Sequence, residues 1–201
     1  MEYQGLTHDD LVNVRALNRA WLARFAPREP LPATPQRLER LANTPFLLFS
    51  FRENDAELWR RLLGDEAHSD LFVTRATPEL QELQSAGLGF LWELARRNPY
   101  VARIVSGAPL KWCDRLASQT LLKVHESAAR AELAEPRFAD DSPVFRRLFV
   151  QGSGALREAR RSAQLAALQA MLTLGESAQL GRLPAAACRM PALEAVVTDK
   201  L

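Results

Sequence analysis

Apolar residues along the chain recur mostly at helical spacing, and short polar or proline-containing segments separate the repeats. At about 100° per residue, one face of the first repeat carries Leu11, Val14, Trp21, Leu22 and Phe25. Thr7 is suited to cap the start of this helix, and the prolines that begin at Pro27 end it. The pattern therefore predicts a helix over residues 7–25.

Five further start signals combine a capping residue with a proline or a carboxylate. They are Thr34-Pro35, Asn54-Asp55, Thr77-Pro78, Asn98-Pro99 and Ser142-Pro143. Apolar residues at helical spacing follow each signal, so we predict a helix after each one. In the helix after Thr77-Pro78, Gly87 interrupts the apolar stripe, and we expect another helix to approach closely there.

Two longer helices are predicted in the second half of the chain. One runs from Pro109 to about Leu133 and has a narrow stripe of mostly small residues, which should pack tightly against a neighbouring helix. The other ends near Leu174. Because it carries no charge from Ala163 onward, we expect it at the centre of the core. Glycines and prolines then divide residues 175–201 into an irregular tail.

The remaining segments fit less regular structure. Residues 46–51 are the single stretch that fits a strand, and residues 65–76 form a looser connection that could include a short helix at 71–73. We predict one all-α domain over residues 1–201, a compact bundle of about seven to nine helices with at most one short extended segment near 46–51. The weakest join in this domain, where the chain could divide, lies near residues 65–77.

Composition sharpens the fold class. The chain has 33 Leu and 31 Ala but only 10 Val and a single Ile, whereas sheets favour β-branched residues. A net charge of +2 with 47% hydrophobic residues argues against wholesale disorder. No apolar run approaches the ~20 residues of a membrane span, and Cys113 and Cys188 form no CxxC motif. We therefore expect a cytoplasmic protein without membrane contact.

Candidate catalytic chemistry is sparse in this sequence. His8, His68 and His125 form no pair with metal-ligand spacing, and Gly152-Ser153-Gly154 lacks the spacing of a nucleophile elbow. We predict no catalytic residue, no metal site and no cofactor. The chain is thus more typical of a binding protein than of an enzyme.

One constellation fits an anion or nucleic-acid site. From Arg146 to Arg161 there are five arginines and one acid around a Gly-Ser-Gly turn. Free amides at a glycine-bounded helix start, together with guanidinium groups, can hold a phosphate. A hinge between two helices with charged, solvated ends explains the same pattern, and a solvated face explains the arginines between Arg15 and Arg40. The candidate residues are Arg146, Arg147, Gly152, Gly154, Arg157, Arg160 and Arg161.

Three further residues are candidates for an interface. Asn18 falls in the middle of the apolar face of the first helix. It is either a buried amide bonded to the backbone or a partner side chain, or a polar contact that sets the register between helices. Trp92 and Trp112 fall away from the main stripes of their helices. Either a second layer covers them, or they form an exposed patch for a partner.

Two stretches near the N-terminus resemble the FlhD subunit of the bacterial flagellar master transcription regulator. Val14–Leu22 is similar to the first helix of that family. Thr34–Ala42, continuing through Phe49–Asp55, is similar to a later helix and the hydrophobic segment after it. The resemblance covers about a quarter of the chain; the helical stretch between the two is replaced here by Pro27–Pro35. It implies a helical, oligomeric regulatory protein that acts with a partner on DNA, and no functional residue is carried over.

These observations favour a non-enzymatic bacterial regulatory or adaptor protein that binds another macromolecule, with a protein partner and a homo-oligomeric state expected. A DNA-binding transcriptional regulator that uses the arginine patches is the first alternative, although a net charge of +2 is low for that role. A helical protein that binds a small ligand or phosphate is the second alternative.

Overall fold

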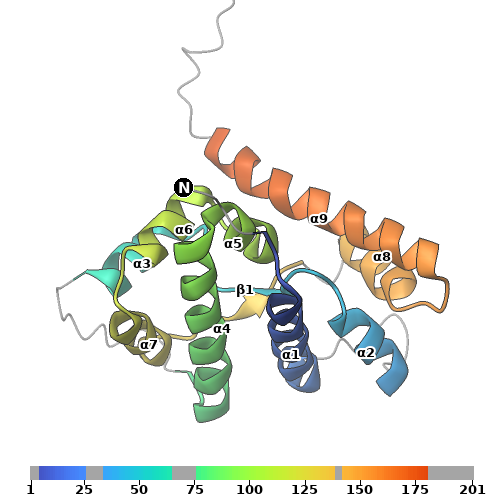
Figure 1. Cartoon of the computed structure of the whole chain (residues 1–201), viewed down its shortest axis with the longest axis horizontal. Coiled ribbons are helices and arrows are strands. Elements are labelled where there is room, and N and C mark those ends of the chain that lie inside the picture. Colours follow the sequence, from blue (N-terminus) through green and yellow to red (C-terminus); the bar gives the residue numbers. More distant parts are fainter. Residues whose placement is uncertain (1–4, 26–33, 65–75, 139–141, 181–201) are drawn as a thin grey trace, which may run out of the picture.

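The computed structural model describes residues 5–25, 34–64, 76–138 and 142–180, and from residue 174 onward it describes the backbone alone. Within these ranges the chain forms nine helices and one pair of two-residue strands (Figure 1). The helices are α1 His8–Phe25, α2 Pro35–Ala42, α3 Ala56–Leu63, α4 Pro78–Arg97, α5 Pro99–Ser106, α6 Leu110–Ala117, α7 Leu121–Arg130, α8 Pro143–Gly152 and α9 Arg157–Leu180. The predicted all-α class is confirmed. The short helix considered at 71–73 lies outside the described residues.

The predicted start signals cap the helices by direct hydrogen bonds. Thr7 and Asp10 bond reciprocally at the start of α1, since each backbone N–H donates to the other side chain. The later caps each accept a hydrogen bond from a backbone N–H of the first turn; they are Thr34, Asp55, Thr77, Asn98 and Ser142. Local sequence therefore determines where most helices begin.

The predicted helix from Pro109 to Leu133 is wrong, because the structure divides it into α6 and α7. Thr120, which lies within that predicted helix, instead caps α7 and accepts from the N–H of Lys123 at 3.3 Å. The carbonyl of Gln119 leaves the helical pattern and accepts a hydrogen bond from Trp92 Nε1 at 2.8 Å. A tertiary bond and a local cap thus outweigh the continuous apolar periodicity.

Helix α4 forms the centre of the molecule and packs against α1, α5, α6 and α7 (Figure 1). Its inner face buries Leu88, Leu91 and Leu94 almost completely. Close approach at Gly87 is confirmed, but the neighbour is an extended segment rather than a helix. A Cβ at Gly87 would lie 2.6 Å from Cζ of Phe51.

Two extended segments cross beside α4 and pair briefly. The strands β1 (Phe49–Ser50) and β2 (Glu135–Pro136) are antiparallel, with Phe49 opposite Pro136 and Ser50 opposite Glu135. The extended segment expected near 46–51 is therefore present. Its partner strand is too short and too polar to produce a recognisable sequence pattern.

Helix α9 lies along one edge of the molecule rather than at the centre of the core (Figure 1). It packs on α8 and touches α5, and its buried side chains are Ala163, Ala167 and Met171. Leu165 is 58% exposed, so the expectation of a central helix is wrong. The helix also continues through Gly175 to Leu180, where an irregular tail was expected. The absence of charge does not bury a helix when the remaining elements cover only one of its faces.

Candidate functional site

The candidate anion site lies in the antiparallel hairpin of α8 and α9. Gly152 is the last residue of α8, and Ser153 is buried with its hydroxyl donating to the carbonyl of Phe149. The glycine turn therefore follows the carbonyl end of α8, which has negative polarity. A Cβ at Gly152 would lie 3.0 Å from Cδ1 of Leu148. This turn joins two closely packed helices, and its geometry differs from that of a phosphate-binding loop.

Arg160 stabilises this turn. Its Nη1 donates to the carbonyl of Gly154 at 2.9 Å and to the carbonyl of Ala155 at 2.6 Å. These carbonyls have no helical partner, so the guanidinium satisfies groups that would otherwise need water. Arg160 is half-buried and has a structural role in this conformation.

The other arginines of the hairpin do not converge on one point. Arg147 donates to Oε1 of Gln151 at 3.3 Å and to Oγ of Ser162 at 3.0 Å. At 3.6 residues per turn, Ser162 lies about 100° around α9 from Arg161 and about 140° from Arg157. Arg147 therefore approaches one side of α9 while Arg157 and Arg161 point to another.

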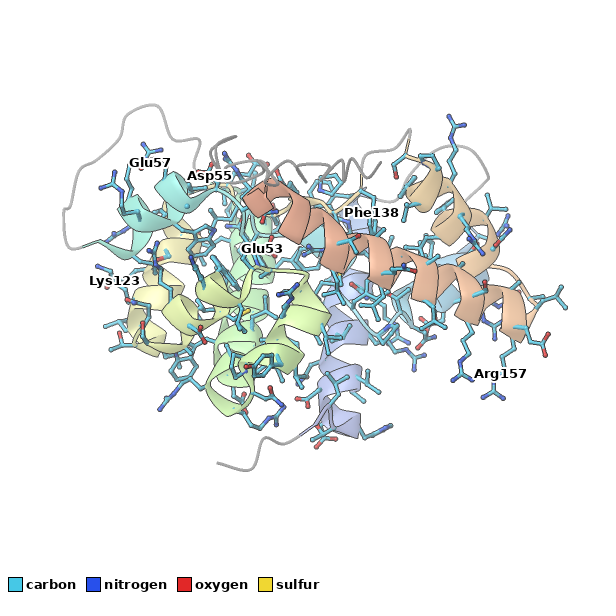
Figure 2. The ribbon with its side chains drawn as sticks, turned by 90° about the horizontal axis from the view of Figure 1, so that it is seen from above. Glu53, Asp55, Glu57, Lys123, Phe138 and Arg157 are labelled. Atoms are coloured by element: carbon cyan, nitrogen blue, oxygen red, sulfur yellow. The ribbon has the colours of Figure 1, made fainter. Side chains whose placement is uncertain are left out.

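Arg146, Arg157 and Arg161 are exposed and form no ion pair with any acid in the described part of the chain. Figure 2 shows Arg157 projecting from the start of α9, whereas Asp55 and Glu57 lie at the opposite end of the molecule. Some exposed arginines elsewhere have acidic partners, as Arg60 has Glu57, whereas Arg96 and Arg115 have none among the described residues. The hairpin arginines thus contribute positive charge that this chain does not neutralise.

The second arginine-rich stretch contacts the hairpin at one point. Arg37 on α2 donates from Nε to Oγ of Ser153 at 3.3 Å. Arg15 and Arg19 instead bind Glu39, and the Arg19 bonds measure 2.6 and 2.7 Å. Hydrogen bonds from Arg19 and Arg15 lower the pKa of Glu39 to about 2. Arg15 and Arg19 of α1 therefore share one acidic partner within the fold.

Asn18 is fully buried and bonded to the backbone, the first of its two interpretations. Its Nδ2 donates to the carbonyls of Ala42 (3.3 Å) and Phe46 (2.9 Å) and to Oγ1 of Thr44 (3.1 Å). Its Oδ1 accepts from the N–H of Leu48 at 2.9 Å. The amide fixes the segment that leads into β1 against α1.

The two tryptophans differ in their surroundings. Trp112 is 5% exposed and meets Trp59 edge to face, with ring centroids 5.2 Å apart. A second layer therefore covers it. Trp92 is half-buried, and the guanidinium carbon of Arg96 lies 4.8 Å from its ring centroid. Of the two, only Trp92 is partly exposed to solvent.

Sequence reasoning missed Gln84, which does for the second extended segment what Asn18 does for the first. Its Nε2 donates to the carbonyls of Ala128 (2.7 Å) and Ala131 (3.0 Å). Its Oε1 accepts from the N–H groups of Leu133 and Ala134, at 2.6 and 2.9 Å. A usable signal was present, because Gln84 follows Leu80 and Leu83 on the buried face of α4.

A buried ion pair between Arg137 and Glu53 completes this polar network. Their side chains are 8% and 2% exposed, and the Nη2–Oε1 distance is 3.1 Å. Arg137 also donates to the carbonyls of Leu47 and Phe49. We call Asn18, Gln84, Glu53 and Arg137 the polar brace, because they hold the two extended segments to each other and to the helices.

No reactive centre accompanies the polar brace in the described ranges. Burial raises the pKa of the Cys113 thiol to about 12, with a further contribution from Glu53, so it stays protonated at neutral pH. No group of three or more His, Cys, Asp or Glu residues among the described ones could hold a metal ion. No described helix is long and apolar enough to cross a membrane.

Comparison with family models, with curated proteins and with solved structures found no match. The resemblance of residues 14–22 and 34–55 to the FlhD family therefore stays a prediction. Function has to be inferred from the surface and the interior of this chain.

Proposed function

We propose that this chain is a non-enzymatic regulatory or adaptor protein that acts by binding another macromolecule, and that it does so in the bacterial cytoplasm. The observation that carries the proposal is the surface of the α8–α9 hairpin. It presents Arg146, Arg157 and Arg161 without acidic partners among the described residues, and the exposed Leu165 follows Arg161 by one turn of α9. Arginines next to apolar side chains are enriched at protein interfaces.

The interior supports a binding role over catalysis. The buried amides of Asn18 and Gln84 and the guanidinium of Arg137 bond to backbone carbonyls, and so they maintain the fold. The buried thiol of Cys113 has a raised pKa, the opposite of what a nucleophile needs. These interior groups maintain the fold, so we propose that the protein acts through contacts that its surface makes with another molecule.

Photo-crosslinking in living cells tests this proposal. A photoreactive amino acid at position 161 should give adducts of higher mass, whereas the same residue at Arg130 on α7, which already pairs with Glu126, should give few. Mass spectrometry then identifies the captured partner. Adducts of equal yield at both positions, or none at positions 146, 157 and 161, would contradict the proposal. Light scattering on the purified chain tests the predicted homo-oligomer.

DNA binding is the second candidate, and the contact between Arg37 and Ser153 favours it, because it adds an arginine of α2 to the basic surface. Each phosphate contact releases counterions, so DNA affinity should fall steeply as salt rises. A gel-shift series across salt concentrations measures this slope. Absence of binding at low salt would exclude DNA as the partner.

A further inference from the structure

Helix α9 turns some of its large apolar side chains outward, while Met171 and two alanines face inward. Ala163, Ala167 and Met171 face α8 and α5 and are buried. Leu165 is 58% exposed, and Leu168 and Leu172 are half-buried. A surface helix of a monomer normally turns its large apolar residues toward the core. The described residues of this chain therefore do not account for the outward face.

The outward residues form a continuous stripe. Arg161, Leu165, Leu168 and Leu172 follow one another at spacings of four, three and four residues, which places them along one side of the helix. Leu168 lies at the edge of this stripe and also packs against the core. Arg157 extends the stripe by one turn along one of its edges, and Glu158 lies at the other edge of the stripe. From Ser162 to Thr173 no residue is charged, a length of about 18 Å at 1.5 Å per residue.

We propose that this stripe docks an amphipathic helix of a partner protein, with leucine-like residues along its seam and acidic residues beside Arg157 and Arg161. The inference rests on the proposed function and names the chemistry of the partner. Alternating spacings of three and four are the pattern that a second helix matches by side-chain packing. The two arginines form no ion pair with an acid in the part of the chain that the structure describes, so acidic residues on the partner give charge complementarity.

Other occupants match the stripe less well. A second copy in parallel orientation would place Arg161 against Arg161, and an antiparallel copy would place it near the uncharged end. In the parallel arrangement the single acid near the stripe, Glu158, would face two arginines of the other copy, so one positive charge would stay without an acid. A nucleic-acid backbone would contact Arg157 and Arg161 but would leave Leu165, Leu168 and Leu172 without an apolar neighbour.

Fluorescence anisotropy with synthetic peptides tests the inference on the full chain. The probe is a labelled 18-residue helix with Leu at the seam positions and Glu beside them. One control peptide replaces each Glu by Lys, and another has the same composition in scrambled order. We expect the acidic helix to bind at least about tenfold more tightly than either control. Equal affinities for all three peptides would overturn the inference.

Paired variants locate the binding. Leu165→Ser and Arg161→Gln should each weaken binding of the acidic helix about tenfold, with the denaturation midpoint unchanged. Leu122→Ser on α7, where the leucine is 70% exposed, and Arg130→Gln serve as matched controls and should leave the affinity unchanged. A loss of binding as large in the control variants as in the α9 variants would contradict the inference.

The remaining outcomes separate this inference from the proposed function. If Leu165→Ser converts a dimer to a monomer in light scattering, a second copy occupies the stripe and the inference is wrong. If duplex DNA binds and only Arg161→Gln weakens it, the stripe is a nucleic-acid surface and the inference is equally wrong. If position 161 gives crosslinks but the three peptides bind with equal affinity, the proposed function is retained and the acidic helix is rejected as the partner. Absence of crosslinks from the hairpin removes the proposed function itself.

Discussion

The polar brace and the α8–α9 hairpin join their secondary-structure elements by different kinds of contact. In the brace, polar side chains are buried, and three of the four bond to the backbone of an extended segment, as Asn18 does with Leu48 and Gln84 does with Leu133. In the hairpin, Ala163 and Ala167 are buried together with larger residues such as Leu148, whereas several arginines and Leu165 face outward. The polar groups of the brace find their partners within the described chain, whereas several exposed arginines and the exposed Leu165 of the hairpin have none there.

This difference locates stability and function in separate parts of the molecule. A buried polar group that loses its partner incurs the full cost of desolvation, so substitutions in the brace should be severe. An exposed leucine or arginine contributes little to folding, so its presence is better explained by a partner. Four substitutions test this division, beginning with the largest expected effect.

Arg137→Ala should be the most destabilising change. It leaves the carboxylate of Glu53 buried without its cation and removes donors from the carbonyls of Leu47 and Phe49. Breaking a buried pair in this way costs roughly 3–5 kcal/mol. Urea denaturation measures the change, and Arg130→Ala, whose pair with Glu126 is exposed, should cost less than about 1 kcal/mol. Equal costs for the two variants would show that the brace contributes no more than a surface pair.

Asn18→Leu should follow in size. The leucine keeps most of the volume but removes the acceptor for the N–H of Leu48 and the donor to the carbonyl of Phe46. With each orphaned buried group costing about 1–3 kcal/mol, we expect a loss of at least about 2 kcal/mol. Asn43→Leu is the matched control, because that amide is exposed and makes a single bond to the carbonyl of Glu39. A control as destabilising as Asn18→Leu would refute the assignment.

Gly107→Ala tests the junction between the two regions. Gly107 has a φ of 67°, and a Cβ there would lie 2.4 Å from Cγ of Met171 on α9. The left-handed conformation alone costs a non-glycine residue roughly 1–2 kcal/mol. The loss should shrink in a Met171→Ala background, because the clash is removed. Gly89→Ala is the control: its Cβ would meet no side chain closer than 3.9 Å, so it should stabilise α4 by about 0.5–1 kcal/mol.

Glu39→Gln should have the smallest effect, visible mainly as a change in pH dependence. The pKa of Glu39 is lowered from 4.5 to about 2, so the stabilisation is present above pH 4.5 and is lost as pH falls through 2. The pair is partly exposed, so we expect no more than about 1 kcal/mol. Urea denaturation at several pH values should show a flatter profile for Glu39→Gln. Glu82→Gln, an exposed acid with no ion pair to a described residue, should keep the profile of the natural chain.

The sequence predicts the helices well because most of their boundaries are encoded locally. Thr34, Thr77 and Ser142 cap the helices that they were expected to begin. The break between α6 and α7 escaped prediction, because it depends on a hydrogen bond from Trp92 to Gln119, two residues that lie far apart in sequence. Propensity and periodicity report on neighbours along the chain and carry no information about such a contact.

The candidate site was predicted only in part. The excess of arginines from Arg146 to Arg161 is visible in the sequence, but the role of Arg160 in binding turn carbonyls depends on where α8 ends. The outward stripe of α9 was hidden by the same uncharged composition that suggested burial. Which face a helix presents to solvent is decided by the packing of the other elements, and so only the structure could show it.

The antiparallel pairing of β1 and β2 has a consequence for the order of folding. Arg137 and Phe49, which it brings together, are separated by 88 positions along the chain, and α3 to α7 lie between them. Closing so long a loop lowers chain entropy before any contact compensates for it. We therefore expect helices to form early and this crossing to form after the rate-limiting barrier. Loss of Arg137 should then accelerate unfolding while leaving the refolding rate almost unchanged.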